Sequence, residues 1–410
     1  MLFTPLALPN GAVLPNRLGK AAMEENLADD DHAPSDKLIR LYQAWADGGV
    51  GLIVTGNVMI DRRALTGPGA VVLENRTHIE RFRRWAQAMR SGGAHAWLQI
   101  SHPGRQTPAA LGQPALAPSA VSLDMGSFSR HFAAPRAMTQ EQIDEVIERF
   151  AHSASLAEEA GFTGVEIHAA HGYLLSQFLS PLANRRDDRW GGDPERRSQL
   201  LVEVIRRVRQ AVTPGFVVAV KLNSADFQRG GFGPQDAKAV VQRLNPRGVD
   251  LVELSGGSYE APAMRGVARD GRTLAREAFF LEFAHEIAAV ARMPLMVTGG
   301  IRRKAVAEQV LASGVSVVGL ATALALNPRL PLEWRAGVES AAALRPVTWA
   351  NKMAGAMAAI AMVRHQMNRL SRGRAPQLGV WPLRALVEDQ LSVAWQARRY
   401  RRWMSARQAA

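Results

Sequence analysis

The residues best suited to chemistry form a short cluster after an apolar run near the middle of the chain. The run Val165–Ile167 is followed by His168, His171 and Tyr173 in the stretch HAAHGY. Imidazoles donate hydrogen bonds or bind metals, and a phenol is a weak acid. A single histidine at such a position is more often structural, and zinc is an alternative for the pair, although zinc normally takes three protein ligands and no third is evident. Three such groups within six residues make a catalytic role as good an explanation as a structural one.

Groups that can hold a ligand follow other apolar runs as well. Gln99 and Lys221 lie at the ends of two runs, Gly299 and Gly300 follow a third, and Glu24 follows the first. A buried lysine could pair with a carboxylate or could stabilise an anionic cofactor. The two glycines could form a simple turn, or their backbone N–H groups could bind a phosphate. If the runs are strands of one parallel barrel, all these residues lie at its catalytic end.

Eight short apolar runs, separated by longer amphipathic segments, indicate the fold. They are rich in β-branched residues and do not alternate with polar ones, as is typical of parallel strands buried on both faces. Their ranges are 18–23, 50–54, 96–100, 165–167, 216–222, 249–254, 295–297 and 315–320. Eight strand–helix units predict an α/β fold of the (β/α)8 TIM-barrel type, with the site where the strands end.

Two of the connecting segments carry signals for the start of a helix. Thr139 and Gln142 form a capping-box pattern for a helix over 138–160. Asp193 suits the N-cap position of a second helix over 195–212, with Pro194 at its start. Alternating arginines and aspartates just before it predict salt bridges that order this loop. The Pro- and Ala-rich segment 103–135 predicts an excursion over one end of the barrel.

Composition limits the functions that the chain can have. With 47% hydrophobic and 21% charged residues, the 410 residues should bury a substantial core. The absence of cysteine excludes disulfides, thiolate metal sites, iron–sulfur clusters and cysteine nucleophiles. No run is long enough to span a membrane and no signal sequence opens the chain, so we expect a cytoplasmic protein.

The net charge of +13 comes largely from the C-terminal end. Residues 361–410 contain ten arginines against only Glu388 and Asp389. Because the repeating pattern stops, we expect a barrel domain over 1–335 and a basic helical extension over 336–410, with helices over 349–370 and 383–404. The extension could dock on an anionic membrane or nucleic acid, but a solvated tail, or one packed on a neighbouring subunit of a homo-oligomer, is favoured. No nucleic-acid-binding module is recognisable, so no nucleic-acid partner is expected.

Three stretches resemble the old yellow enzyme family of FMN-dependent oxidoreductases. They are FTPLALPNGAVLPNRLGKAAM, HAAHGYLLSQFLSPLANRRDDRWGGDPERR, and MPLMVTGGI with VVGLATALALNP. The resemblance runs in order from about residue 2 to residue 335 and is nearest to the branch that includes the bacterial 2,4-dienoyl-CoA reductases. It implies a noncovalent FMN at the barrel mouth, reduced directly by NADH or NADPH, and a small enone-type substrate whose activated C=C bond is reduced. The cluster-binding cysteines and second domain that this branch often carries are not found in this chain.

The resemblance also implies roles for residues at matching positions. His168 and His171 match the pair that donates hydrogen bonds to the carbonyl oxygen of the substrate, and Tyr173 matches the proton donor. Gln99 and Lys221 match positions on the pyrimidine side of the flavin. The full set of implied cofactor contacts is Ala22, Met23, Glu24, Asn57, Gln99, Lys221, Gly299, Gly300, Ala321 and Thr322. No matching position lies beyond residue 335, so the extension is expected to be dispensable for flavin binding.

Two positions depart from the family pattern. Thr322 stands where the family usually has an arginine that binds the phosphate, so FMN would be held by other donors or less tightly. Glu24 stands where the family commonly has Thr or Cys, and an ionised carboxylate there would disfavour the anionic reduced flavin. An FMN-binding barrel with lost or altered turnover, acting as a binding module, is therefore the alternative to an active ene-reductase.

Overall fold

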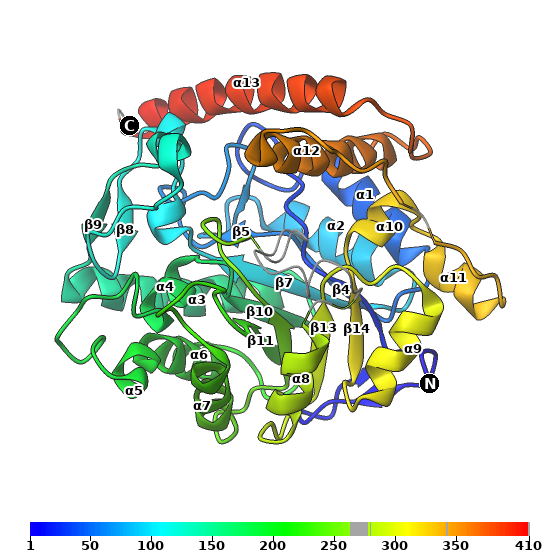
Figure 1. The fold of residues 1–410 in the computed structure, drawn as a ribbon, viewed down its shortest axis with the longest axis horizontal. Coiled ribbons are helices and arrows are strands. Elements are labelled where there is room, and N and C mark those ends of the chain that lie inside the picture. The colour runs from blue at the N-terminus through cyan, green and yellow to red at the C-terminus, as the bar shows by residue number, and fades with distance from the viewer. Residues whose placement is uncertain (263–277, 279, 342, 409–410) are drawn as a thin grey trace.

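The computed structural model describes residues 1–262, 278, 280–341 and 343–408, and within them the chain forms a closed barrel of eight parallel strands (Figure 1). The strands are β3 (Leu18–Lys20), β4 (Leu52–Val54), β7 (His95–Ser101), β10 (Gly164–Ala169), β11 (Val217–Asn223), β12 (Leu251–Ser255), β13 (Leu295–Thr298) and β14 (Val317–Leu320). Each pairs with the next, and β14 pairs with β3, which closes the ring. The predicted TIM-barrel fold is confirmed, and each predicted run overlaps one strand.

Helices follow the strands and cover the outside of the barrel. The longer ones are α1 (Asp36–Ala46), α2 (Ile79–Arg90), α3 (Gln140–Glu159), α6 (Gln199–Ala211), α7 (Pro234–Leu244), α8 (Leu281–Ala288) and α9 (Lys304–Ala312). The shorter ones are α4 (Leu174–Leu179), α5 (Pro194–Arg197), α10 (Thr322–Leu326) and α11 (Leu330–Arg335). Thr139 and Gln142 form the predicted capping box of α3, and Asp193 caps α5 with Pro194 at its start.

The helix predicted over 195–212 is instead two helices, α5 and α6, with a break at Ser198. The Ser198 Oγ donates a hydrogen bond to the Glu195 carbonyl oxygen at 2.8 Å and also accepts one from Arg243 at 2.6 Å. A serine that bonds to nearby backbone competes with a continuous helix. The pattern that predicted one continuous helix here carried no signal for the break.

The barrel has two apolar cores, because alternate side chains of each strand point to opposite sides of the sheet. The inner core contains Leu52, Val54, Trp97, Val217, Ala219, Leu251, Met296 and Val317. The N-terminal hairpin of β1 (Leu6–Ala7) and β2 (Val13–Leu14) adds Leu8 and Leu14 to this inner core. Since the hairpin packs at the N-terminal ends of the strands, a ligand site is left to the opposite end, where the strands finish.

The segment between β7 and α3 forms the predicted excursion. It contains β8 (Ala115–Ala117) paired with β9 (Pro135–Ala137), and the 3-10 helices η1 (Gly104–Gln106), η2 (Ala109–Leu111) and η3 (Gly126–His131). A smaller addition after β4 contains β5 (Val58–Met59) and β6 (Val71–Val72).

In the loop before α5, Arg186 pairs with Asp188 at 2.5 Å, and Arg196 of α5 pairs with Asp193 at 2.7 Å. The predicted salt bridges of this loop are therefore present.

The C-terminal extension packs on the barrel of its own chain. Its helices are α12 (Lys352–Leu370) and α13 (Pro382–Gln408), which lie together along the top of Figure 1. Met367 and Leu370 of α12 join the outer core of the barrel. The Tyr400 Oη of α13 donates to the Arg62 carbonyl oxygen at 2.8 Å. The helices were predicted, but their place on the barrel was not. No helix among the described residues is long and apolar enough to cross a membrane.

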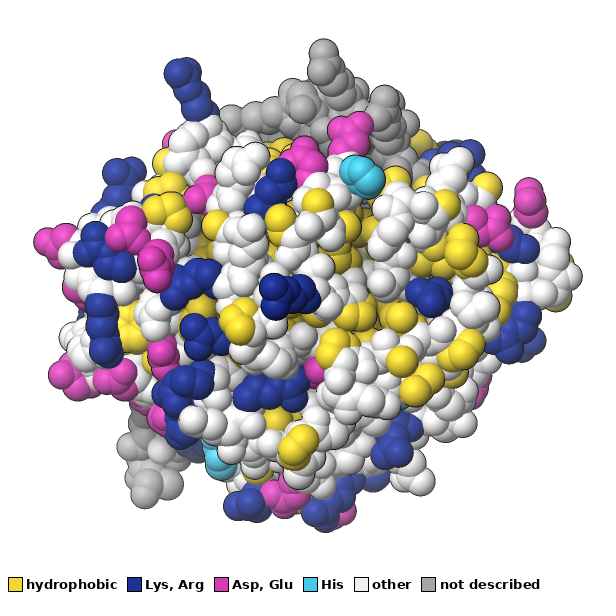
Figure 2. Space-filling view, turned by 90° about the horizontal axis from the view of Figure 1, so that it is seen from below, with side chains coloured by type: hydrophobic (Ala, Val, Ile, Leu, Met, Phe, Trp, Pro, Cys, Tyr) yellow, Lys and Arg dark blue, Asp and Glu magenta, His cyan; other side chains and the backbone are white. Residues whose placement is uncertain are grey.

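The face turned away from α13 carries both signs of charge. Figure 2 shows this face, where Lys and Arg side chains lie among acidic and apolar ones. Much of the basic character of the chain belongs instead to residues 361–410, which form most of α12 and all of α13. The contacts of α12 and α13 therefore decide whether this positive charge is available to a partner.

Candidate active site

A cavity of about 810 Å³ lies where the barrel strands end. Of the residues predicted from the sequence, it is lined by Ala22, Met23, Glu24, Asn57, Gln99, His168, His171, Tyr173, Lys221 and Thr322. Gly299, Gly300 and Ala321 are not in its wall. The two glycines follow β13 directly and Ala321 follows β14. The structure thus brings the predicted catalytic cluster and most of the predicted cofactor positions to one place.

His168 is a neutral hydrogen-bond donor at the end of β10. Its ring is buried, and Nδ1 accepts a hydrogen bond from the Ala170 N–H at 3.2 Å. The hydrogen of a neutral ring must then be on Nε2. Burial holds the pKa of His168 well below its usual range, and the neighbouring His171 and Lys221 lower it further. The ring therefore remains neutral near pH 7 and donates through Nε2.

His171 is held in a backbone conformation that few side chains adopt. Its φ is +60°, and such residues persist where the surroundings fix them. The His171 N–H donates to Asn223 Oδ1, and Gln106 Nε2 donates to the His171 carbonyl oxygen, both at 3.1 Å. Its ring Nε2 is 2.7 Å from Ser255 Oγ. These contacts come from β11, η1 and β12 and fix the imidazole 5.1 Å from the ring of His168.

Tyr173 completes the cluster and contacts a second tyrosine. Its ring meets His168 edge to face at 4.8 Å. Its Oη is 3.0 Å from the Oη of Tyr259, and Asn57 Nδ2 donates to it at 3.4 Å. Tyr259 also lines the cavity and was not predicted. Its signal in the sequence was its place shortly after the end of β12.

Lys221 and Gln99 each bond to a buried glutamate. The Lys221 Nζ is 2.5 Å from Glu253 Oε1, and Gln99 Nε2 donates to Glu166 Oε1 at 2.6 Å. Burial, and then the charge of Glu253, raises the pKa of Glu166 well above its usual range. Of the two explanations offered for Lys221, pairing with a carboxylate is confirmed. Both glutamates were missed, although a carboxylate inside an apolar run, as in GVEI and LVEL, is a signal for a buried partner.

The donor groups around the cavity fit FMN. The amide of Gln99 and the ammonium of Lys221 suit the polar edge of a flavin. Gly299 and Gly300 have φ values of +120° and +77°, which leaves their backbone free of side chains where a phosphate could approach. Glu24 Oε1 and Asn57 Oδ1 are buried without a hydrogen-bond partner among the described residues.

The cavity wall does not end at residue 335. Residues of the extension complete it: Leu344, Arg345, Pro346, Val347, Trp349, Gly355, Ala356, Ala359, Ile360, Val363, Arg364 and Met367. The prediction that the extension is dispensable for flavin binding rested on matched positions alone, and a resemblance that stops near residue 335 carried no information about this wall. The contacts place α12 beside the catalytic cluster instead.

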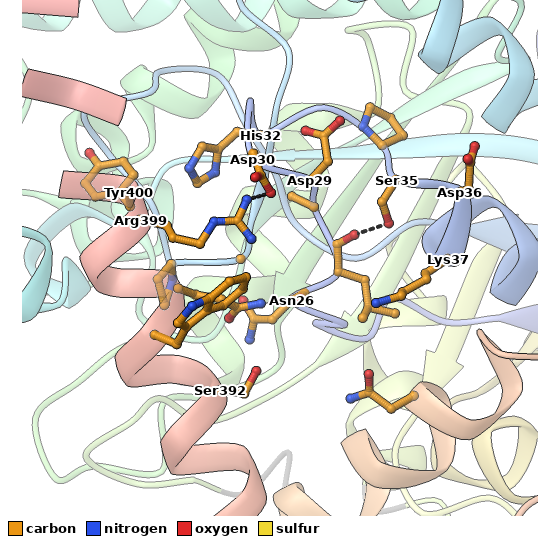
Figure 3. Close-up of a pocket in the computed structure, with 18 of the residues that line it drawn as sticks. Asn26, Asp29, Asp30, His32, Ser35, Asp36, Lys37, Ser392, Arg399 and Tyr400 are labelled. Atoms are coloured by element: carbon orange, nitrogen blue, oxygen red, sulfur yellow. Dashed lines mark hydrogen bonds and ion pairs between the residues drawn. The ribbon is translucent and has the colours of Figure 1, made fainter. Parts of the chain in front are cut away.

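A second cavity, of about 650 Å³, lies between the loop after β3 and α13 (Figure 3). Its charged side chains largely compensate one another, because Arg399 pairs with Asp30 and Arg81 pairs with Asp29. None of the predicted catalytic residues lines it. Among the described residues there is also no group of three or more His, Asp or Glu that could hold a metal ion. The first cavity is therefore the candidate active site.

Comparison with known sequences finds relatives that cover the barrel. The sequence profile of the NADH:flavin oxidoreductase / NADH oxidase family matches residues 1–340. NADH-dependent flavin oxidoreductase iliE of Neonectria sp. (strain DH2) is 42% identical over 352 residues, which cover 80% of this chain and 46% of that protein. The chain therefore spans less than half the length of this relative.

Solved structures show the same fold. A complex of 2-naphthoyl-CoA reductase with 2-naphthoyl-CoA matches with a TM-score of 0.76 and 26% identity, over 82% of this chain and 52% of that one. The old yellow enzyme homologue from Zymomonas mobilis matches with a TM-score of 0.70 and 24% identity, over 82% of this chain and 92% of that one. The second match shows that the two chains share the barrel fold.

Proposed function

This chain belongs to the NADH:flavin oxidoreductase / NADH oxidase family, of the old yellow enzyme type, and from this premise we propose that it uses FMN and NADH or NADPH to reduce the activated C=C bond of an α,β-unsaturated carbonyl compound. Bound FMN supplies reversible two-electron chemistry between the two substrates. The protein supplies the binding groups, their orientation and the proton.

The observation that carries the proposal is the meeting of two imidazoles and a phenol in one cavity wall. His168 and His171 bind the carbonyl oxygen of the substrate. Hydrogen bonds to this oxygen draw electron density away from the β-carbon, which makes that carbon a better hydride acceptor. Tyr173 then gives its proton to the α-carbon, since a phenol is acidic enough to protonate an enolate but remains protonated near pH 7.

Most of the cofactor positions line the same cavity, and Gly299, Gly300 and Ala321 follow β13 and β14. Gln99 and Lys221 hold the polar edge of the flavin, where the ammonium of Lys221, itself paired with Glu253, donates a hydrogen bond to the ring. The backbone N–H groups of Gly299 and Gly300 bind the phosphate together with Thr322 at the start of α10. Ala22, Met23, Asn57 and Ala321 contact the ring system or the chain between ring and phosphate.

The substrate class is supported by the solved relative whose bound ligand is 2-naphthoyl-CoA. That ligand carries a carbonyl group conjugated with unsaturated carbon, the same arrangement that His168, His171 and Tyr173 are suited to polarise and protonate. We infer a conjugated carbonyl compound for this chain, bound with its oxygen toward the two histidines.

A second candidate function is an FMN-binding barrel with lost or altered turnover. The observation that favours it is Glu24, a carboxylate in the cavity wall where the family commonly has an uncharged side chain. A negative charge beside the flavin opposes formation of the reduced anion unless a positive charge offsets it. Under this alternative the protein binds the cofactor and a ligand without reducing the ligand.

The two candidates are separated by following the flavin of the purified protein. We expect a yellow protein whose flavin absorbance is bleached by NADH or NADPH without oxygen and restored by an enone, with the saturated ketone as product. Acid release and chromatography should identify the flavin as FMN. Bound FMN that no nicotinamide reduces, or reduced flavin that no conjugated carbonyl compound reoxidises, would favour the binding module.

A further inference from the structure

Arg364 belongs to the extension but lies in the wall of the active-site cavity. Its Nη2 is 3.3 Å from Glu24 Oε2, and its Nη1 is 3.3 Å from both carboxylate oxygens of Asp389. The side chain is 18% exposed. Arg364 therefore connects the loop after β3 with α12 and α13, and it lies outside residues 1–340, which the family profile matches.

Arg364 remains charged, and its pair with Glu24 is incompletely satisfied. Burial opposes the charge of Arg364, yet the carboxylates of Glu24 and Asp389 raise its pKa above the usual value. Glu24 Oε1 and Arg364 Nε are both buried without a hydrogen-bond partner among the described residues. Buried polar atoms without partners are costly and usually have a reason. Here they lie beside a cavity that fits a cofactor.

The position of the pair bears on the chemistry of a flavin. A lone carboxylate in this wall would oppose the negative charge that the ring gains on reduction. A guanidinium 3.3 Å from the same carboxylate offsets that effect, because opposite charges at short range nearly cancel at a third site. Asp389 keeps Arg364 in place from the side of α13.

We propose that Arg364 is a positioning residue of the active site, which holds Glu24 in an ion pair and thereby allows a carboxylate to stand beside the flavin without opposing its reduction. The inference rests on the proposed function, since it concerns the same cavity. It makes the extension a part of the redox site. The competing explanation is that Arg364 only fastens α12 to the barrel.

The test is the two-electron midpoint potential of the bound flavin, measured against reference dyes. We expect Arg364→Met to make the potential more negative, by at least the roughly 30 mV that corresponds to a tenfold change in the equilibrium. Arg364→Lys should retain most of the wild-type potential. Glu24→Gln should make the potential more positive, and Glu24→Gln added to Arg364→Met should bring it back toward wild type.

Arg369→Met is the matched control on α12. Arg369 donates to the Ala375 carbonyl oxygen and does not line the active-site cavity, so its loss should leave the potential unchanged. A folded, FMN-loaded Arg364→Met protein with the wild-type potential would overturn the inference. If that variant fails to fold, an unchanged potential in Glu24→Gln would overturn it instead. Wild-type protein that binds no flavin would overturn the proposed function and this inference together.

Discussion

At the scale of the residue, the cavity places the phenol of Tyr173 beside two groups that can donate hydrogen bonds to its phenolate form. Tyr173 Oη lies 3.0 Å from Tyr259 Oη and within 3.4 Å of Asn57 Nδ2. After Tyr173 gives up its proton, both groups can donate to the phenolate oxygen. The second tyrosine therefore gives the proposed proton donor a partner that stabilises its charged form.

Replacement of Tyr173 by Phe removes the proposed acid and leaves the ring in place. Reduction of the flavin by nicotinamide needs no proton for an alkene, so we expect this half-reaction to stay nearly intact. The half-reaction with an enone should slow by roughly the 10²- to 10⁴-fold typical of a general acid. Stopped-flow measurement of each half-reaction checks this. Tyr259→Phe is the matched comparison and should slow the same step less, because the acid itself remains. Equal losses in both half-reactions would rule out the role of Tyr173.

The residues that could be predicted from the sequence are those in local clusters after a strand. His168, His171 and Tyr173 lie within six residues, so their meeting required only one correctly placed strand. Arg364 is 340 residues from Glu24 along the chain, and its contact depends on how α12 docks. Pairings at such separations leave no local pattern that a single sequence could show.

At the scale of the element, the barrel strands could be predicted because each is buried on both faces and therefore has no polar alternation. The helices of the extension could be predicted, but their docking could not. An amphipathic pattern shows which face of a helix is buried and not which surface covers it. In α13 that surface is formed by Met59, Leu65, Ala70 and Leu111 of the barrel loops, which pack with Ala397, Tyr400 and Met404.

Tyr400 offers a test of how strongly α13 is docked. Tyr400→Phe loses the hydrogen bond to the Arg62 carbonyl oxygen and should lower the free energy of unfolding by about 0.5–1.5 kcal/mol. Tyr400→Ala also leaves a cavity under α13 and should cost about 3–5 kcal/mol. Leu391 lies on the outer side of the same helix with 68% of its surface exposed, so Leu391→Ala should change stability by less than about 0.5 kcal/mol. Denaturant titrations provide the values. A Tyr400→Ala protein as stable as Leu391→Ala would show that α13 is not held by this contact.

At the scale of the whole molecule, the basic extension meets acidic groups of the same chain. Arg399 pairs with Asp30, and Arg407 lies 3.8 Å from Asp31. These aspartates belong to the acidic run of residues 29–31 in the loop after β3. From the sequence, the arginines were expected to be solvated or to pack on a neighbouring subunit, with an anionic membrane or nucleic acid as the alternative. The acidic run, more than 350 residues away, was not recognised as their complement within the chain.

Buried histidines should make the stability of the whole protein depend on pH. Burial lowers the pKa of His102 to about 4, from 6.5 in the unfolded chain. Between these values the unfolded state binds more protons, so the stabilisation is present above about pH 6.5 and is lost as pH falls toward 4. The loss from His102 alone should reach about 2 kcal/mol at pH 5. His102→Asn can keep the acceptor for the Gly104 N–H and should flatten the fall in unfolding free energy between pH 7 and pH 5. An unchanged pH profile would contradict this assignment.

Cofactor binding should stabilise the barrel as one unit, because the cavity is built from the ends of strands all around the ring. A ligand that binds only the folded state at 100 times its dissociation constant adds about 2.7 kcal/mol to the free energy of unfolding. We expect FMN added to flavin-free protein to raise the melting temperature. Riboflavin, which lacks the phosphate, should raise it much less at the same concentration, because it cannot use the backbone N–H groups of Gly299 and Gly300. Thr322→Arg should enlarge the difference between the two flavins, since a cation at the start of α10 would act on the phosphate alone. Equal shifts with FMN and riboflavin in the unsubstituted protein would mean that the loops after β13 and β14 do not bind the phosphate.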